Sequence, residues 1–259
     1  MQDRPPETDA AQTEIVTAAV LVIGDEILSG RTKDTNIATI AQHLTSIGIR
    51  LCEARVVADD QAAIIAALDA LRTRYDYVFS TGGIGPTHDD ITTDSVARAF
   101  GVAVETNQRA VAMMREFYPE SELTPSRLRM TRIPVGAELI ENPVSKAPGF
   151  MIGNVAVMAG IPRIMTAMLK NVTSRLRTGE KLLSLSIHAP ELESNIAEFL
   201  SATQIAFPDV MIGSYPYSDE RGRGTYLTLR AVSAERLRTA ATVLIERIRE
   251  AGWRCDDPE

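Results

Sequence analysis

The sequence predicts an α/β protein, a three-layer α/β/α sandwich with a doubly wound, mostly parallel sheet, followed by a small C-terminal α+β domain. Two observations support this fold class. From residue 15 onward, apolar runs typical of strands alternate with segments whose apolar residues recur at helical spacing, as in successive βαβ units. Near residue 178 this alternation gives way to a compact pattern of its own, which indicates a second domain.

The first half of the sandwich follows from three strands and two helices. We expect strands at 15–24, 49–57 and 75–81, with helices at 34–48 and 59–74 between them. Strands joined by helices pair in parallel, and the crossovers are right-handed. Ligands of such sheets bind beyond the carboxyl ends of the strands, so the loops that follow the strands are the place to look for a site.

The second half is predicted to be mainly helical. Helices are expected at 92–101, 107–120, 124–134 and 161–177, with the middle two covering the sheet. A single strand is expected over 150–160, after a loop with two prolines and a glycine.

These patterns divide the chain into three parts. Residues 1–14 are polar, acidic and rich in proline, without an apolar central region, and are expected to form a flexible arm rather than a signal peptide. Residues 15–177 form the first domain. Residues 178–259 carry the order β, α, β, β, α and form the small α+β domain.

Composition excludes several classes of protein. The formal net charge is −7 and no dense run of lysine or arginine occurs, which argues against nucleic-acid binding. No apolar stretch approaches the length of a membrane span, so a cytoplasmic protein is expected. Cys52 and Cys255 have neither metal-site nor disulfide spacing, and the three histidines are scattered. Any metal would be held mainly by oxygen.

The segment "TGGIGPTHDD", residues 81–90, directly follows an expected buried strand. It lacks the lysine of a P-loop, and its glycine spacing differs from that of a dinucleotide fingerprint. The glycines alone fit a tight chain reversal as well as a phosphate contact. The hydroxyl and carboxylates of Thr87, Asp89 and Asp90 favour function, because together they suit phosphate with a hard cation.

Two other loops at the same predicted edge are acidic. Asp25 and Glu26 follow the first strand, and Asp59 and Asp60 follow the second. Each pair alone is explained by helix capping or solvent contact, with Asp60 the nearer to a simple cap. Their convergence with the glycine loop favours a site, because clustered like charges are unfavourable unless a cation or ligand offsets them.

Together, "LVIGDEILSGRTKDTN", "VADD", "TGGIGPTHDDIT" and "APGF" resemble the molybdopterin-binding domain family, and specifically its competence/damage-inducible protein A branch. The resemblance covers residues 15 to about 175, and the C-terminal unit is similar to the small module that follows this domain in that branch. Longer members append an amidase domain that this sequence does not include, so pyridine-nucleotide deamidation is not expected.

The resemblance implies a pocket for a phosphorylated ligand, molybdopterin or a nucleotide, and in this branch metal-dependent cleavage of dinucleotide pyrophosphates such as ADP-ribose. It also implies self-association into a homo-oligomer. It assigns catalytic roles to Asp59 and Asp90. With the loop positions, the metal candidates for Mg²⁺, Mn²⁺ or Co²⁺ are Asp25, Glu26, Asp59 and Asp90. The expected ligand contacts are Gly24, Thr81, Gly82, Gly83, Gly85, Pro86, Thr87, Lys146, Pro148, Gly149 and Gly160.

The sequence departs from the branch at two loops. It has Arg163 and Ile164 where the branch has serine and glutamate, and Ser145 and Lys146 where the branch has glycine and threonine. If these loops reach the pocket, one acid is lost and two cations are gained. This favours binding of a phosphorylated pterin or nucleotide over metal-dependent hydrolysis of ADP-ribose or FAD-type substrates. A scaffold without catalysis is the third alternative.

Overall fold

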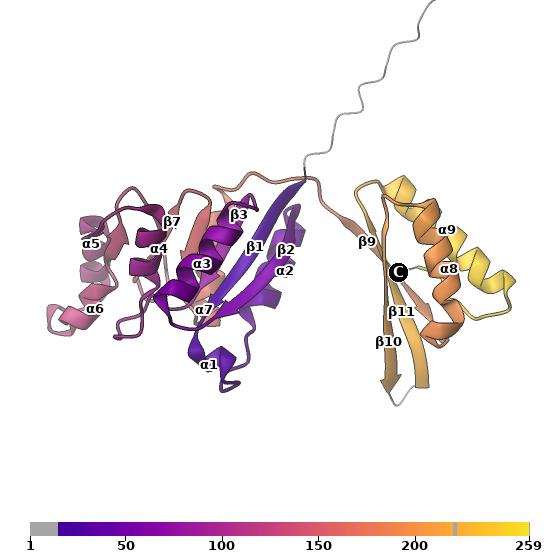
Figure 1. The fold of residues 1–259 in the computed structure, drawn as a ribbon, viewed down its shortest axis with the longest axis horizontal. Helices are drawn as coiled ribbons and strands as arrows, with labels where there is room; N and C mark the ends of the chain where they lie inside the picture. Colours follow the sequence, from indigo (N-terminus) through magenta and orange to yellow (C-terminus); the bar gives the residue numbers. More distant parts are fainter. Residues whose placement is uncertain (1–14, 220–221, 259) are drawn as a thin grey trace, which may run out of the picture. The chain divides into compact units, whose positions relative to one another are not determined.

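A computed structural model describes residues 15–219 and 222–258 (Figure 1). The chain divides into two compact units, Met1–Gly179 (unit 1) and Glu180–Glu259 (unit 2). The expected N-terminal arm, residues 1–14, lies outside the described residues. Among the described residues, no helix combines the length and the apolar character needed to cross a membrane.

Unit 1 is built on a six-stranded sheet in the order β2-β1-β3-β8-β7-β6. The strands are β1 (Val16–Ile23), β2 (Ile49–Val57), β3 (Tyr77–Thr81), β6 (Glu138–Ile140), β7 (Gly149–Ile152) and β8 (Val155–Met158). The first four strands in this order pair in parallel, and β7 and β6 add antiparallel pairs. The chain runs from β1 to β2 on one side and then returns to β3 on the other. The predicted doubly wound, mostly parallel sheet is therefore confirmed.

Helices cover both faces of this sheet because its central strands are apolar on both sides. Val20 of β1 belongs to a core cluster with α2 (Asn36–Ser46) and α7 (Pro162–Thr173). Leu21, its neighbour, belongs to a second cluster with α3 (Gln61–Arg72) and α4 (Thr92–Phe100). Successive strand residues point to opposite faces, so one buried strand supplies two cores.

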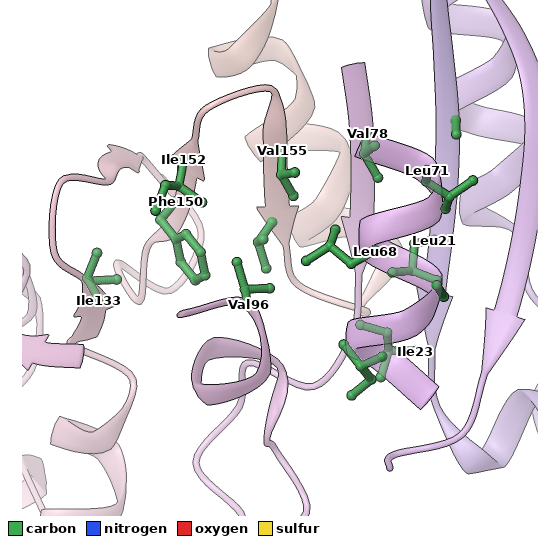
Figure 2. Close-up of a cluster of buried hydrophobic side chains, with 14 of the residues drawn as sticks. Leu21, Ile23, Leu68, Leu71, Val78, Val96, Ile133, Phe150, Ile152 and Val155 are labelled. Atoms are coloured by element: carbon green, nitrogen blue, oxygen red, sulfur yellow. The ribbon is translucent and has the colours of Figure 1, made fainter. Parts of the chain in front are cut away.

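Figure 2 shows the second cluster, in which Leu68 and Leu71 of α3 lie toward the strand residues Leu21 and Val78. Leu68 is fully buried. Burying a leucine side chain contributes about 1.5–3 kcal/mol, so these contacts hold α3 against the sheet.

The prediction of a single strand over 150–160 is wrong, because this segment forms two antiparallel strands, β7 and β8, joined as a hairpin. Ile152 pairs with Val155, which leaves a two-residue turn of Gly153 and Asn154. Gly153 has φ 55°, a conformation that favours glycine. The long apolar run concealed the turn, although Gly-Asn between apolar segments is a hairpin signal.

The helix predicted over 124–134 is also shorter than expected. Thr124 caps the short helix α6 (Pro125–Arg129), and the chain then forms β5 (Arg132–Pro134), paired with β4 (Val104–Thr106). The helix predicted over 107–120 is α5 (Gln108–Phe117), followed by a 3₁₀ turn, η1 (Glu120–Glu122). The short strands β4, β5 and β6 and the four-residue helix α1 (Asp25–Leu28) were not predicted, because elements of this length carry little periodicity.

Unit 2 has the predicted order of elements. These are β9 (Leu183–Ala189), α8 (Glu193–Ala206), β10 (Met211–Asp219), β11 (Gly222–Ala231) and α9 (Ala234–Glu250). The strands form an antiparallel sheet in the order β10-β11-β9. Leu227 and Leu229 of β11 pack with Leu237 and Leu244 of α9 in a separate core, so the small α+β domain is confirmed.

Candidate functional site

A cavity of about 480 Å³ lies at the carboxyl ends of the parallel strands of unit 1. It receives residues that follow each of β1, β2, β3 and β8, and residues from the loop between β6 and β7. Its lining is Ile23, Gly24, Glu26, Asp59, Gly82, Gly83, Ile84, Gly85, Pro86, Asp89, Asp90, Met130, Asn142, Ser145, Ala147, Ala159, Gly160, Ile161 and Ile164. Each of the three acidic loops that the sequence placed at one edge of the sheet therefore contributes at least one residue to the lining of this cavity.

The glycines at the start of the 81–90 loop have structural reasons to be there. A Cβ on Gly82 would lie 2.1 Å from the Ile23 carbonyl oxygen, and a Cβ on Gly83 would lie 2.1 Å from Thr92 Oγ1. Both have positive φ. Thr92 Oγ1 also donates to the Gly82 carbonyl oxygen at 3.0 Å, which fixes the loop against α4. Glycine here allows a close approach of backbone to backbone and to helix, at the wall of the cavity.

Asp90 closes the same loop from its other end. Its Oδ2 accepts a hydrogen bond from the Thr87 backbone N–H at 2.7 Å and another from the Thr87 hydroxyl. The N-cap of α4 is Ile91, which makes no side-chain cap. Asp90 therefore holds the loop rather than capping the helix, whereas Asp60 is a true cap and accepts from the Ala63 backbone N–H at 2.8 Å.

Asp59 is a lining carboxylate whose pKa is raised above its ordinary value. Burial raises the pKa of Asp59, a hydrogen bond from the Asp25 backbone N–H at 3.0 Å opposes the rise, and the neighbouring carboxylates of Asp25, Glu26 and Asp89 add to it. A raised pKa means that the ionised form is disfavoured here until a cation or donor arrives.

The lining of the cavity is acidic and apolar. Glu26, Asp59, Asp89 and Asp90 contribute carboxylates, and none of the lining residues is lysine, arginine or histidine. Ile164, which stands where the branch has glutamate, does line the cavity, but Lys146 and Arg163 do not. The expectation that two cations are gained at the pocket is therefore wrong for the described lining, because both side chains lie outside it.

Six expected site residues do not line the cavity: Asp25, Thr81, Thr87, Lys146, Pro148 and Gly149. Thr87 and Asp25 act indirectly, through their hydrogen bonds to Asp90 and Asp59. Thr81 is buried in β3, and Gly149 lies in β7 where a Cβ would be 2.2 Å from the Val157 carbonyl oxygen. Gly149 is thus required by strand packing. Lys146 adopts φ 59°, with its N–H bonded to the Asn142 carbonyl oxygen at 3.0 Å.

Sequence reasoning expected the loop between β6 and β7 at the pocket through Lys146 and Pro148, but missed Asn142 and Ala147, which line the cavity. Asn142 organises this loop: its Oδ1 accepts from the Val144 and Ser145 N–H groups, and its Nδ2 donates to the Ala147 carbonyl oxygen. Asparagine before proline is a turn signal, so Asn142 could have been recognised. The apolar wall of Ile84, Met130 and Ile161 carries no such signal.

The carboxylates do not form a complete metal site by themselves. Within residues 15–219 and 222–258, no three His, Cys, Asp or Glu side chains meet closely enough to hold a metal ion. The candidates Asp25, Glu26, Asp59 and Asp90 are therefore near one cavity without forming a ready-made ligand set.

This fold and site define a class: doubly wound α/β proteins with a cavity at the point where the strand order reverses, here between β1 and β3. The chain belongs to the family described as "Probable molybdopterin binding domain", which matches residues 19–178. A second family, "FAD synthase, middle domain", matches residues 181–255.

Individual relatives agree with this assignment. The chain is 34% identical over 209 residues to Protein Ta0487 of Thermoplasma acidophilum, which covers 78% of this chain and 82% of that protein. It is 36% identical over 196 residues to a CinA-like protein of Syntrophotalea carbinolica, covering 70% of this chain. The chain spans 48% of that protein's length.

A solved structure agrees as well. The protein CinA of unknown function from Thermoplasma acidophilum matches with a TM-score of 0.59 and 38% identity, over 62% of this chain and 98% of that one. These relatives confirm the predicted family and its competence/damage-inducible branch.

Proposed function

We propose that unit 1 binds a phosphorylated pterin or nucleotide in the cavity at the carboxyl ends of its strands. The observation that carries this proposal is that one cavity joins the 82–86 glycine loop to an apolar wall that includes Ile84, Met130 and Ile161. Apolar side chains suit the faces of a heterocycle, and the N–H groups of a glycine loop suit phosphate oxygens. The volume of about 480 Å³ is within the range of small-molecule sites.

Binding of a phosphate here requires a divalent cation. Glu26, Asp59 and Asp90 would repel an anionic ligand, and the described lining offers no basic side chain to compensate. Carboxylate oxygens are donors that Mg²⁺ and Mn²⁺ accept, and Mg²⁺ commonly combines one or two carboxylates with ligand phosphates. Oxygens of the ligand would complete a set that the protein alone leaves incomplete.

Calorimetry of the full chain with ADP tests both statements. We expect an ADP binding event that depends on Mg²⁺ and weakens at least tenfold in EDTA, because the cation offsets the carboxylate charge. Mass spectrometry of a ligand that co-purifies with the protein would identify the heterocycle. If neither ADP nor a pterin phosphate binds with Mg²⁺, Mn²⁺ or Co²⁺ present, the proposal is wrong.

A second candidate function is divalent-metal-dependent cleavage of a dinucleotide pyrophosphate of the ADP-ribose or FAD type. The raised pKa of Asp59, at the cavity wall, favours it, because such a carboxylate is a better proton acceptor for an attacking water. A bound metal would supply polarisation of the phosphate oxygens. Incubation of the full chain with ADP-ribose and Mg²⁺, Mn²⁺ or Co²⁺, with detection of AMP, distinguishes the two candidates.

A further inference from the structure

Unit 2 has a cavity of its own, of about 570 Å³. The helices α8 and α9 cover one face of the β9–β11 sheet (Figure 1). Strand residues that line the cavity lie on the other face. In β11, Leu227 and Leu229 are buried under the helices. Tyr226 directly precedes Leu227 in the strand and therefore points to the opposite face. The lining is Ser186, His188, Pro190, Tyr217, Gly222, Arg223, Tyr226, Asp256 and Asp257.

A hydrogen-bonded relay crosses this cavity. An ionised carboxylate only accepts, so His188 Nδ1–H donates to Asp256 Oδ2 at 2.6 Å. In the neutral ring Nε2 then accepts from the Tyr217 hydroxyl at 2.7 Å. The backbone N–H of Asp256 also donates to the His188 carbonyl oxygen at 2.9 Å, which holds the C-terminal segment against β9. The relay thus fixes the imidazole and the Tyr217 ring in one orientation.

The three rings that line the cavity form a platform. Ring centroids of His188, Tyr217 and Tyr226 lie 5.0, 5.1 and 5.6 Å apart, with interplanar angles of 34–40°. Gly224, opposite Tyr217 in the sheet register, makes room for this arrangement, because a Cβ there would lie 2.6 Å from the Tyr217 hydroxyl. A platform of rings offers a stacking surface to a planar ligand.

The charges of the cavity leave one cation without an ion pair. Asp256 accepts a hydrogen bond from His188, and Asp257 forms an ion pair with Arg249 at 3.0 Å. Arg223 lines the cavity and forms no ion pair within the part of the chain that the structure describes. A guanidinium in this position suits a phosphate group, which it can bind through two parallel hydrogen bonds.

We propose that this cavity is a second, metal-independent site for a mononucleotide, whose ring stacks on Tyr226 and whose phosphate is bound by Arg223. His188 and Asp256 are positioning residues that hold the platform. The volume fits one nucleotide, and the neighbouring carboxylates together with the net charge of −7 disfavour the successive phosphates of a nucleic-acid strand. The proposal is independent of the function proposed for unit 1.

Calorimetry of the full chain with AMP in EDTA tests the site, because EDTA removes the cation that the unit 1 site is proposed to need. We expect AMP to bind, and adenosine or ribose 5-phosphate alone to bind at least tenfold more weakly. Arg223→Ala and Tyr226→Leu should each lower AMP affinity at least tenfold. Arg230→Ala, which changes an exposed arginine of the same strand outside the cavity, should leave it within twofold.

Three results would overturn this proposal. One is an absence of AMP binding in EDTA at millimolar concentrations while the melting curve shows a folded protein. Another is AMP binding that Arg223→Ala and Tyr226→Leu leave unchanged. The last is tighter binding of single-stranded RNA than of AMP, increasing with oligonucleotide length, which would indicate a nucleic-acid surface. Loss of Mg²⁺-dependent ADP binding alone would affect only the unit 1 proposal.

Discussion

Asp90 connects the local structure of the glycine loop to the charge of the unit 1 cavity. Its carboxylate accepts two hydrogen bonds from Thr87, and a Cβ on Gly85 would lie 2.7 Å from its Oδ2. The same side chain lines the cavity. Its geometric role needs only an oxygen acceptor, whereas a role in cation-dependent binding needs the negative charge.

Asp90→Asn separates these two roles. Asparagine keeps an acceptor for Thr87, so we expect the melting temperature to change little. Mg²⁺-dependent ADP affinity should fall at least tenfold, or roughly 1.4 kcal/mol. Asp60→Asn is the matched control, because that residue caps α3 and does not line the cavity. Calorimetry and melting curves of both variants decide the question, and equal ADP affinity in wild type and Asp90→Asn would make the carboxylate structural.

Asp59 predicts a pH dependence of stability. Its pKa is raised in the folded protein, chiefly by burial, so the unfolded chain loses this proton at lower pH than the folded chain does. Stability is therefore lost as pH rises from the ordinary aspartate pKa through the raised one. Asp59→Asn should raise the melting temperature at pH 7 in EDTA, with the gain disappearing below the ordinary aspartate range. Melting curves from pH 3 to 8 measure this, and an equal or lower melting temperature at pH 7 would contradict it.

At the scale of elements, helix α3 both packs against the sheet and begins directly after the acidic loop of the site. Its N-cap, Asp60, follows Asp59 directly, and its buried side Ile64, Leu68 and Leu71 packs on the sheet. The position of the second acidic loop thus depends on the packing of the helix that follows it.

Leu68→Ala should lower the free energy of unfolding by about 2–5 kcal/mol, because it removes buried methyl groups and leaves a cavity. Leu28→Ala is the control, since Leu28 is 56% exposed, and its effect should stay within about 0.5 kcal/mol. Urea unfolding of both variants provides the measurement. A loss below 1 kcal/mol for Leu68→Ala would mean that the α3 core is loosely packed.

At the scale of the whole molecule, each unit has its own core clusters and its own cavity. The core clusters of unit 1 share no residue with that of unit 2. In the sequence, unit 1 ends at Gly179 and unit 2 begins at Glu180. Units with separate cores commonly fold independently.

We expect a fragment ending at Gly179 to unfold cooperatively and to bind ADP with Mg²⁺ as tightly as the full chain does. The reason is that all residues lining the 480 Å³ cavity lie within it. Limited trypsin digestion should cut near Arg177 or Lys181, on either side of the junction. An insoluble fragment, or digestion confined to other regions, would argue against independent folding.

The sequence alone determined the parallel sheet, the helices over it and the small second domain. Long strands such as Val16–Ile23 and helices such as Gln61–Arg72 extend over enough residues for their apolar pattern to identify the type of element. It also located the glycine loop and the acidic loops at one edge, because connectivity places the carboxyl ends of parallel strands together. Short elements such as Val104–Thr106, and the turn at Gly153, were missed because a few residues carry too little pattern.

Only the tertiary structure decided which of these loop residues face the cavity. Asp59 and Asp90 line it, whereas Lys146, in another loop, and Arg163, in the first turn of α7, do not. The direction of a side chain in an irregular loop depends on distant contacts, such as those that Asn142 makes with its own loop, and no local periodicity encodes them. The same reason explains the relay of Asp256, His188 and Tyr217, which joins residues 29 and 68 positions apart through strand pairing and a folded C-terminal segment.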